Sequence, residues 1–222
     1  MPLVVGWDMS TGTGVLAAGR GGRLLAEEHH SSRARYTGWL MPAIISMVSD
    51  CGASRTDISL LVAGTGPGSY SGVKAGVSTA RALAAGLGIP LAGVPTLDLL
   101  AASLAGRKKK VLLVMGAGRD KLYTAAYRPD GLMMCPVAGY RCLEPGEVDR
   151  MVLSLGWKDF ILAGQPPPGL EEAFIARGAG VETVLMSHPR GTQIIEQGIA
   201  RLEEGLPGSP LDVLPVYLRS PV

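Results

Sequence analysis

One stretch of the sequence that could do chemistry is rich in glycine: GTGPGSYSGVKAGVSTARALAAG, from Gly64 to Gly86. Glycine-rich loops that lead into a helix often bind phosphate through backbone N–H groups. The Walker pattern is absent, because Val73 and not lysine follows Gly72. The dinucleotide fingerprint is also incomplete, since its third glycine is replaced by Ser69 or Ser71. Generic anion binding at the start of the helix stays open.

A structural role for the same glycines competes with phosphate binding. Gly66, Pro67 and Gly68 together predict a sharp turn, in which glycine supplies a positive φ and proline fixes its own. Ser69 or Ser71 can cap the helix that follows. We therefore expect the loop to shape a tight turn and not to hold a nucleotide.

The helix after this turn has one face made of very small residues. Gly72, Gly76 and Ala80 recur every four residues, so they share that face. Glycine inside a helix costs about 1 kcal/mol relative to alanine, which suggests that close contact compensates for it. We expect the face to dock against another helix, within the chain or in a partner.

A carboxylate and two hydroxyls follow the first predicted strand, PLVVGW. Asp8, Ser10 and Thr11 lie on the turn after it. A carboxylate at a strand end beside hydroxyls could orient a magnesium ion bound to phosphate. The favoured interpretation is that Asp8 accepts hydrogen bonds from the backbone of its own turn.

Peptidase chemistry and metal binding find little support in the sequence. The histidines His29, His30 and His188 lack an H-x-x-x-H spacing, and neighbouring strand residues point to opposite faces. The serines between Gly68 and Gly72 have the wrong spacing for a G-x-S-x-G nucleophile elbow. We therefore expect no metal site and no serine nucleophile.

Composition indicates a globular protein. The 222 residues are 47% hydrophobic and 18% charged, and the net charge of +2 is too small to argue for nucleic-acid binding. The odd number of cysteines favours free thiols, at Cys51, Cys135 and Cys142. With no signal-peptide pattern and no apolar run of about 20 residues, we expect a cytoplasmic protein without a membrane span.

The order of predicted elements indicates an internal duplication. Residues 2–25 and 110–134 both read as strand, glycine-rich turn, strand, tight turn, strand, and helical patterns follow the first copy. This predicts an α/β protein with two lobes, residues 1–106 and a smaller lobe of residues 107–222. A duplicated β-meander followed by helices is typical of the actin-like and sugar-kinase-like (RNase H-like) fold.

Four stretches resemble the bacterial TsaB (YeaZ) family. Residues 63–101 are similar to its signature G-R-G-P-G-S-F-T-G-[VL]-R-I-G, and the turn at Asp8 and the strands of residues 112–127 match in order. The C-terminal motif P-x-Y-L-R matches at Pro215, Tyr217, Leu218 and Arg219.

The resemblance implies a two-lobed actin-like fold and a subunit that is not catalytic alone. TsaB-like proteins pair with a catalytic subunit, TsaD, and an ATPase, TsaE, to transfer a threonylcarbamoyl group to tRNA adenosine. The resemblance thus implies no resident cofactor, ATP use by the complex, tRNA contact only through the complex, and a homodimer when alone. The implied partner interface comprises Gly66, Pro67, Gly68, Ser69, Tyr70, Gly72, Lys74, Gly76 and Ala80.

The chain departs from the family pattern in both lobes. Thr65 and Lys74 replace signature arginines, and Gly116, Gly118 and Lys121 replace an aspartate, an arginine and a glutamate of the second lobe. A kinase or ATPase of this fold, with a Mg–ATP site at the lobe cleft, is the alternative function. It is the weaker alternative because only Asp8 remains of the turn carboxylates. A homodimeric module with another partner is a third possibility.

Basic residues outside these motifs have two interpretations. The run from Arg107 to Lys110, and the pair Arg33 and Arg35, can be solvated surface or can contribute tRNA phosphate contacts in a complex. The solvated surface is the favoured interpretation.

Overall fold

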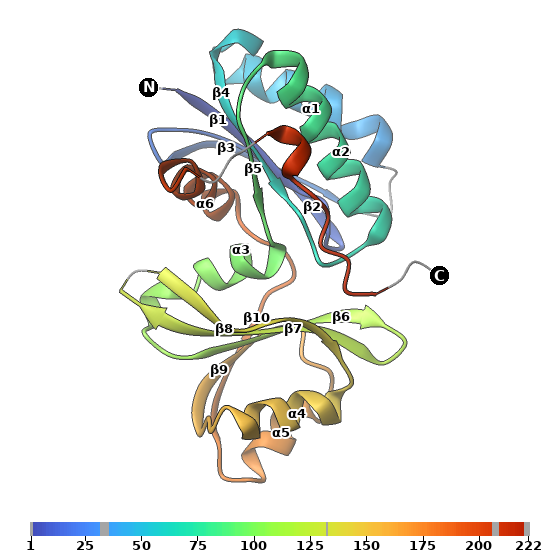
Figure 1. Cartoon of the computed structure of the whole chain (residues 1–222), viewed down its shortest axis with the longest axis vertical. Coiled ribbons are helices and arrows are strands. Elements are labelled where there is room, and N and C mark those ends of the chain that lie inside the picture. Colours follow the sequence, from blue (N-terminus) through green and yellow to red (C-terminus); the bar gives the residue numbers. More distant parts are fainter. Residues whose placement is uncertain (1, 32–35, 132, 206–208, 220–222) are drawn as a thin grey trace. The chain divides into compact units, whose positions relative to one another are not determined.

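The structure, a computed structural model, describes residues 2–31, 36–131, 133–205 and 209–219 (Figure 1). The chain forms two compact units. The first comprises Met1–Leu99 with His188–Tyr217, and the second comprises Leu100–Ser187 with Leu218–Val222. Among the described residues, no helix combines the length and the apolar character needed to cross a bilayer.

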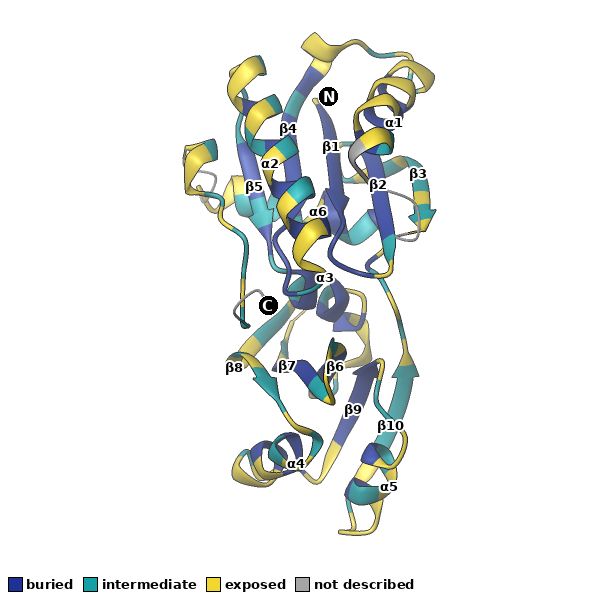
Figure 2. Cartoon of the chain, turned by 90° about the vertical axis from the view of Figure 1, so that its right-hand side faces the viewer, coloured by how far each residue is buried: buried dark blue, intermediate teal, exposed yellow. Residues whose placement is uncertain are grey.

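The first unit contains a five-stranded sheet in the order β3-β2-β1-β4-β5. Its meander of antiparallel strands is β1 (Leu3–Asp8), β2 (Thr13–Arg20) and β3 (Arg23–Ser31). Strands β4 (Ile58–Gly64) and β5 (Leu91–Val94) extend the sheet parallel to β1. Every residue of β1 is buried, as expected for a strand covered on both faces (Figure 2).

Alternation along β1 sends its side chains into two separate cores. Leu3, Val5 and Trp7 pack under α1 (Tyr36–Asp50) and α2 (Tyr70–Leu87). Val4 belongs to the core under α6 (Gly191–Glu203) on the opposite face. Figure 1 shows these helices on the two sides of the sheet. The short elements η1 (Arg55–Asp57) and η3 (Pro210–Asp212) also belong to this unit, and α3 (Thr96–Ala102) begins in it and ends in the second unit.

The position of α6 corrects the predicted boundary, which assigned all of residues 107–222 to a second lobe. Ile194 and Ile195 are fully buried in the first unit. A Cβ atom on Gly198 would lie 2.1 Å from Cγ2 of Val62, so the helix backbone contacts β4 directly. The reason is hydrophobic burial, because this face of the first sheet is covered by α6 and would otherwise be exposed.

The second unit repeats the topology of the first. Its sheet order is β10-β9-β6-β7-β8, with an antiparallel meander and two parallel strands. The strands are β6 (Val111–Gly118), β7 (Lys121–Asp130), β8 (Met133–Leu143), β9 (Asp159–Gly164) and β10 (Gly180–Leu185). The helical elements are η2 (Ala105–Arg107), α4 (Pro145–Ser154) and α5 (Leu170–Ile175). The predicted duplication is therefore visible in the strand order.

Candidate functional site

The glycine-rich loop packs against the turn that carries Asp8. A Cβ atom on Gly64 would lie 2.0 Å from Oδ2 of Asp8, and one on Gly68 would lie 2.1 Å from the carbonyl oxygen of Ser10. The backbone N–H of Ser69 donates to that same carbonyl at 2.7 Å. These glycines allow two turns to touch, which is the structural role expected for the loop.

Asp8 is the centre of a buried hydrogen-bond network. Its Oδ1 accepts from the N–H of Ser10 at 2.8 Å and from the Ser10 hydroxyl at 2.5 Å, and its Oδ2 accepts from the Thr96 hydroxyl at 2.5 Å. The two hydroxyls lie 2.6 Å apart. Sequence reasoning missed Thr96, which is 88 positions from Asp8 and follows Pro95 at the end of β5.

The carboxyl of Asp8 is enclosed by hydroxyls. The hydroxyls of Ser10 and Thr96 each donate to one of its oxygens, and they also contact each other. Burial raises the pKa of Asp8 above its usual value, although hydrogen bonds from Ser10 and Thr96 and the charge of His188 oppose this shift. A buried carboxyl whose oxygens both accept hydrogen bonds offers little to a magnesium ion.

Thr11, the third residue of the predicted phosphate site, also bonds within its own turn. Its hydroxyl donates to the carbonyl oxygen of Thr13 at 2.6 Å, and the side chain is buried. In the part of the chain that the structure describes, no group of three His, Cys, Asp or Glu side chains could hold a metal ion. The turn therefore presents no converging set of free oxygen ligands.

Replacing Asp8 by asparagine tests whether the pKa of Asp8 is raised in the folded chain. With a raised pKa, the contribution of Asp8 to stability is fully present below the unfolded pKa of about 3.8 and is lost as pH rises through the folded value. Asparagine keeps the shape without this titration. We expect the free energy of unfolding of Asp8→Asn, measured in urea, to increase relative to wild type between pH 4 and pH 8. An equal and large destabilisation at both pH values would contradict a raised pKa.

The small-residue face of α2 packs inside the first unit, which corrects the expectation that it docks another helix. Gly72, Gly76 and Ala80 are buried. The indole Nε1 of Trp7 donates to the carbonyl oxygen of Gly76 at 3.0 Å, and a Cβ there would lie 3.3 Å from Cγ of Met9. Small residues are therefore needed on this face because the side chains of Trp7 and Met9 lie directly against the helix backbone. These three residues cannot form a partner surface while the unit stays folded.

The rest of the predicted interface divides by exposure. Gly66 and Pro67 are buried and joined by a cis peptide bond, and Gly68 is half-buried. The exposed members are Ser69, Tyr70 and Lys74. The hydroxyl of Ser69 caps α2 by accepting from the N–H of Gly72 at 3.4 Å.

The C-terminal motif adds a second aromatic ring to this surface. The rings of Tyr70 and Tyr217 lie 5.1 Å apart, and Nζ of Lys74 lies 5.9 Å from the Tyr70 ring. The N–H of Val216 donates to the carbonyl of Thr65 at 2.8 Å, which anchors the segment beside the glycine-rich loop.

In the second unit, Arg219 of the same motif bonds to the end of β6. Its guanidinium donates to the carbonyl oxygens of Ala117 and Gly118, the latter at 3.1 Å. Gly118 has a φ of 71°, a left-handed conformation that glycine adopts without the steric cost that a side chain adds. Glycine in place of the family's arginine at position 118 therefore suits this tight hairpin. Nothing in the structure explains the replacements at Gly116 and Lys121.

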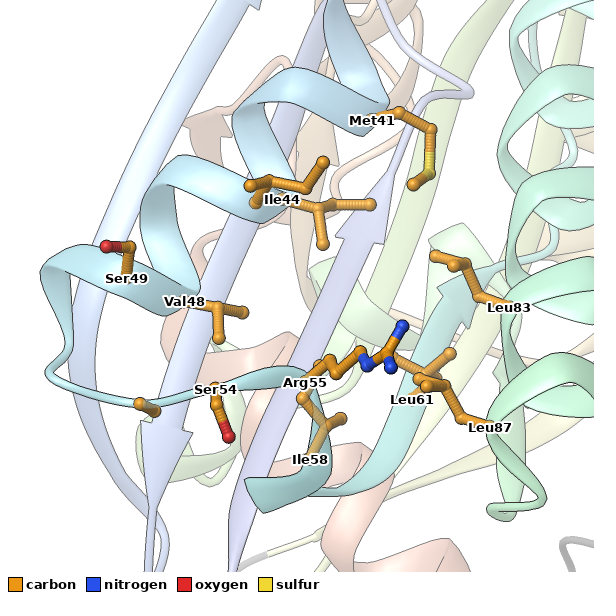
Figure 3. A pocket seen from close by; sticks show the side chains of 12 residues that line it. Met41, Ile44, Val48, Ser49, Ser54, Arg55, Ile58, Leu61, Leu83 and Leu87 are labelled. Carbon is orange, nitrogen blue, oxygen red and sulfur yellow. The ribbon is translucent and has the colours of Figure 1, made fainter.

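The first unit has an apolar groove between α1 and α2, with a volume of about 500 Å³ (Figure 3). Met41, Ile45 and Leu87 are among its lining side chains. The Ile45 side chain is 65% exposed and Met41 is 38% exposed. Ile44 and Val48 of α1 are buried, whereas Met41 and Ile45 beside them stay exposed and line the groove. This groove was not predicted from the sequence.

Most of the basic run from Arg107 to Lys110 makes contacts within the second unit. Arg107 pairs with Glu182, and Nζ of Lys109 lies 3.5 Å from Glu182 and 3.6 Å from Asp159. Nζ of Lys110 lies 5.6 Å from the ring of Trp157. These contacts favour the surface interpretation of the run. Arg33 and Arg35 lie outside the described residues.

The histidines contact aromatic or acidic neighbours. His29 lies 3.0 Å from a carboxylate oxygen of Glu27 and 5.0 Å from the ring of His188, whereas His30 stacks on Trp39 at 4.3 Å. Burial lowers the pKa of His188. His29 and His30 thus have different partners, as expected for neighbours on a strand.

Comparison with known proteins identifies the family. Residues 24–184 match the model of the TsaD family, described as tRNA N6-adenosine threonylcarbamoyltransferase. Two relatives carry the name tRNA threonylcarbamoyladenosine biosynthesis protein TsaB. The one from Bacillus subtilis is 37% identical over 59% of this chain and 57% of its own length. The one from Escherichia coli is 28% identical over 84% of this chain and 82% of its own length. The chain belongs to the TsaD family, and within that family to the TsaB/YeaZ proteins.

Solved structures show that this TsaB/YeaZ chain has the expected fold. YeaZ from Pseudomonas aeruginosa superimposes with a TM-score of 0.78, at 20% identity, over 98% of this chain and all of that protein. An activator of 2-hydroxyisocaproyl-CoA dehydratase from Clostridium difficile, solved with bound ADPNP, gives a TM-score of 0.51 at 10% identity, over 91% and 95% of the two chains. The two-lobed α/β fold of the actin-like class is confirmed.

Proposed function

We propose that this TsaB/YeaZ chain is a non-catalytic subunit of a tRNA threonylcarbamoyladenosine transferase, and that it binds a TsaD-like catalytic subunit. Its activity belongs to the complex, in which a TsaE-like ATPase uses ATP and tRNA is bound by the assembly. The names of the two TsaB relatives support the pathway. The groove between α1 and α2 supports the binding role.

The groove carries this proposal because it exposes apolar side chains that a lone protein usually covers. Ile45 alone is 65% exposed, and its neighbours Met41 and Leu83 continue the apolar lining. Exposed apolar patches of this kind mark interaction sites. Since the chain matches the TsaD family model, a TsaD-like protein shares its fold and offers equivalent helices with which to pair.

The state of Asp8 supports a scaffold over an ATPase. An actin-like ATPase needs an ionised carboxylate that can reach a metal-bound phosphate. Asp8 is fully buried, and both of its oxygens are hydrogen-bonded to Ser10 or Thr96. These bonds leave Asp8 poorly placed to act as a metal ligand at this turn.

Reconstitution of the reaction tests the function. Purified TsaD-like and TsaE-like proteins of the same organism, with threonylcarbamoyl-adenylate synthase, ATP and tRNA, are assayed with and without this chain. We expect modified adenosine, detected by mass spectrometry, only when the chain is present, and none with the chain and substrates alone. Full modification in its absence would refute the proposal.

A further inference from the structure

Arg55, on η1, is the one charged residue among those that line the groove between α1 and α2. Figure 3 shows it among the apolar side chains of the lining. No aspartate or glutamate is among the lining residues. Within the described ranges, no ion pair of the Arg55 guanidinium is found.

The carboxylates closest in sequence are occupied elsewhere. Oδ2 of Asp57 accepts from the N–H of Ser54 at 2.7 Å and from its hydroxyl at 2.8 Å, and these bonds lower the pKa of Asp57. Asp50 accepts from the hydroxyl of Ser46 at 3.3 Å. Both carboxylates are used within their own local turns, so Arg55 stays exposed to water in the free chain.

Covering the groove changes the environment of Arg55. In water the guanidinium is hydrated, and its aliphatic stem can cover the apolar floor formed by Ile58 and Leu61. A docked partner removes that water, and an unpaired buried charge is strongly unfavourable. The planar guanidinium is best satisfied by a carboxylate, which can accept two parallel hydrogen bonds.

We propose that the groove accepts an apolar helix of another protein that carries an aspartate or glutamate opposite Arg55. The inference rests on the proposed function and names the chemistry of the partner at that surface. Arg55 then determines which partner fits, because an apolar helix without the acid would leave the guanidinium desolvated and unpaired.

The same argument disfavours a second copy of this chain as the occupant. A two-fold interface through the groove brings identical lining residues together. It would bury two Arg55 guanidiniums and supply no carboxylate from the lining of either copy. If the homodimer expected for the free chain uses this groove, it is therefore weaker than the complex with an acidic partner helix.

Three substitutions test the role of Arg55 in the full-length chain. Affinity for the TsaD-like protein of the same organism is measured by calorimetry, and self-association by light scattering. We expect Arg55→Glu to weaken the complex by about 30-fold or more, as is typical for disrupting a buried charge pair. Arg55→Met should weaken the complex less and strengthen self-association. The control Arg23→Glu changes an exposed arginine on β3, outside the groove, and should bind as wild type does.

The outcomes separate this inference from the proposed function. If the wild-type chain does not bind, both fail. A second outcome is that the wild type binds, Ile45→Lys does not bind and Arg55→Glu binds normally. The groove is then the binding site, but the role of Arg55 is overturned. If Arg55→Met does not increase self-association, the argument against a second copy is overturned. Thermal unfolding confirms that each variant is folded.

Discussion

Ile45→Lys is expected to reduce affinity for a TsaD-like subunit at least 100-fold without unfolding the chain. Ile45 is 65% exposed on α1, and lysine has a good helix propensity, so the free protein should keep its stability. In the complex the ammonium would be buried in the apolar groove, at a cost of several kcal/mol. Lysine is chosen over glutamate because a new carboxylate could pair with Arg55.

Ile175→Lys is the matched control for this prediction. Ile175 is 53% exposed at the end of α5, in the second unit, and is not one of the residues that line the groove. We expect this variant to bind with wild-type affinity in calorimetry. Equal losses of affinity in both variants would indicate a nonspecific effect of charge, and normal binding by Ile45→Lys would exclude the groove.

Gly68→Ala is expected to destabilise the chain by about 3 kcal/mol, at the upper end of overpacking effects. Its Cβ would lie 2.1 Å from the backbone carbonyl oxygen of Ser10, which cannot move aside as a flexible side chain can. The turns would have to separate, which breaks the hydrogen bond from Ser69 to Ser10 and exposes the Asp8 network. For a chain of this size we expect the melting temperature to fall by about 10 °C.

Gly86→Ala provides a control with the opposite sign. Gly86 lies in α2, and a Cβ there would meet nothing within 4 Å. Alanine has a higher helix propensity, so this variant should be more stable by up to about 1 kcal/mol. Calorimetric melting of the two variants side by side checks both expectations. Similar melting temperatures for them would contradict the tight contact at Gly68.

The sequence predicts the repeated meander well because its signals are local. Alternating apolar strands and glycine turns recur in residues 2–25 and 110–134, and the structure contains two sheets with matching strand orders. The packing of α6, in contrast, could not be predicted from local signals. Its apolar stripe, with Ile194 and Ile195, is visible locally, but the sheet that it covers is far away in the sequence.

The candidate site shows the same limit. Helical spacing predicts that Gly72, Gly76 and Ala80 share a face, which is correct, but spacing does not reveal what that face contacts. The indole of Trp7 and the side chain of Met9 occupy it. Likewise, the partner of Asp8 at Thr96 and the open groove at Ile45 depend on tertiary packing, which no local pattern encodes.

Site-specific photo-crosslinking tests most directly whether the groove between α1 and α2 binds a TsaD-like subunit. Benzoylphenylalanine is placed at Ile45 in one variant and at Ile175 in another. Each variant is mixed with the TsaD-like protein of the same organism and irradiated, and the products are mapped by mass spectrometry. We predict a crosslink from position 45 to one helix of the partner and none from position 175. A stable complex that crosslinks from position 175 and not from position 45 would contradict the account.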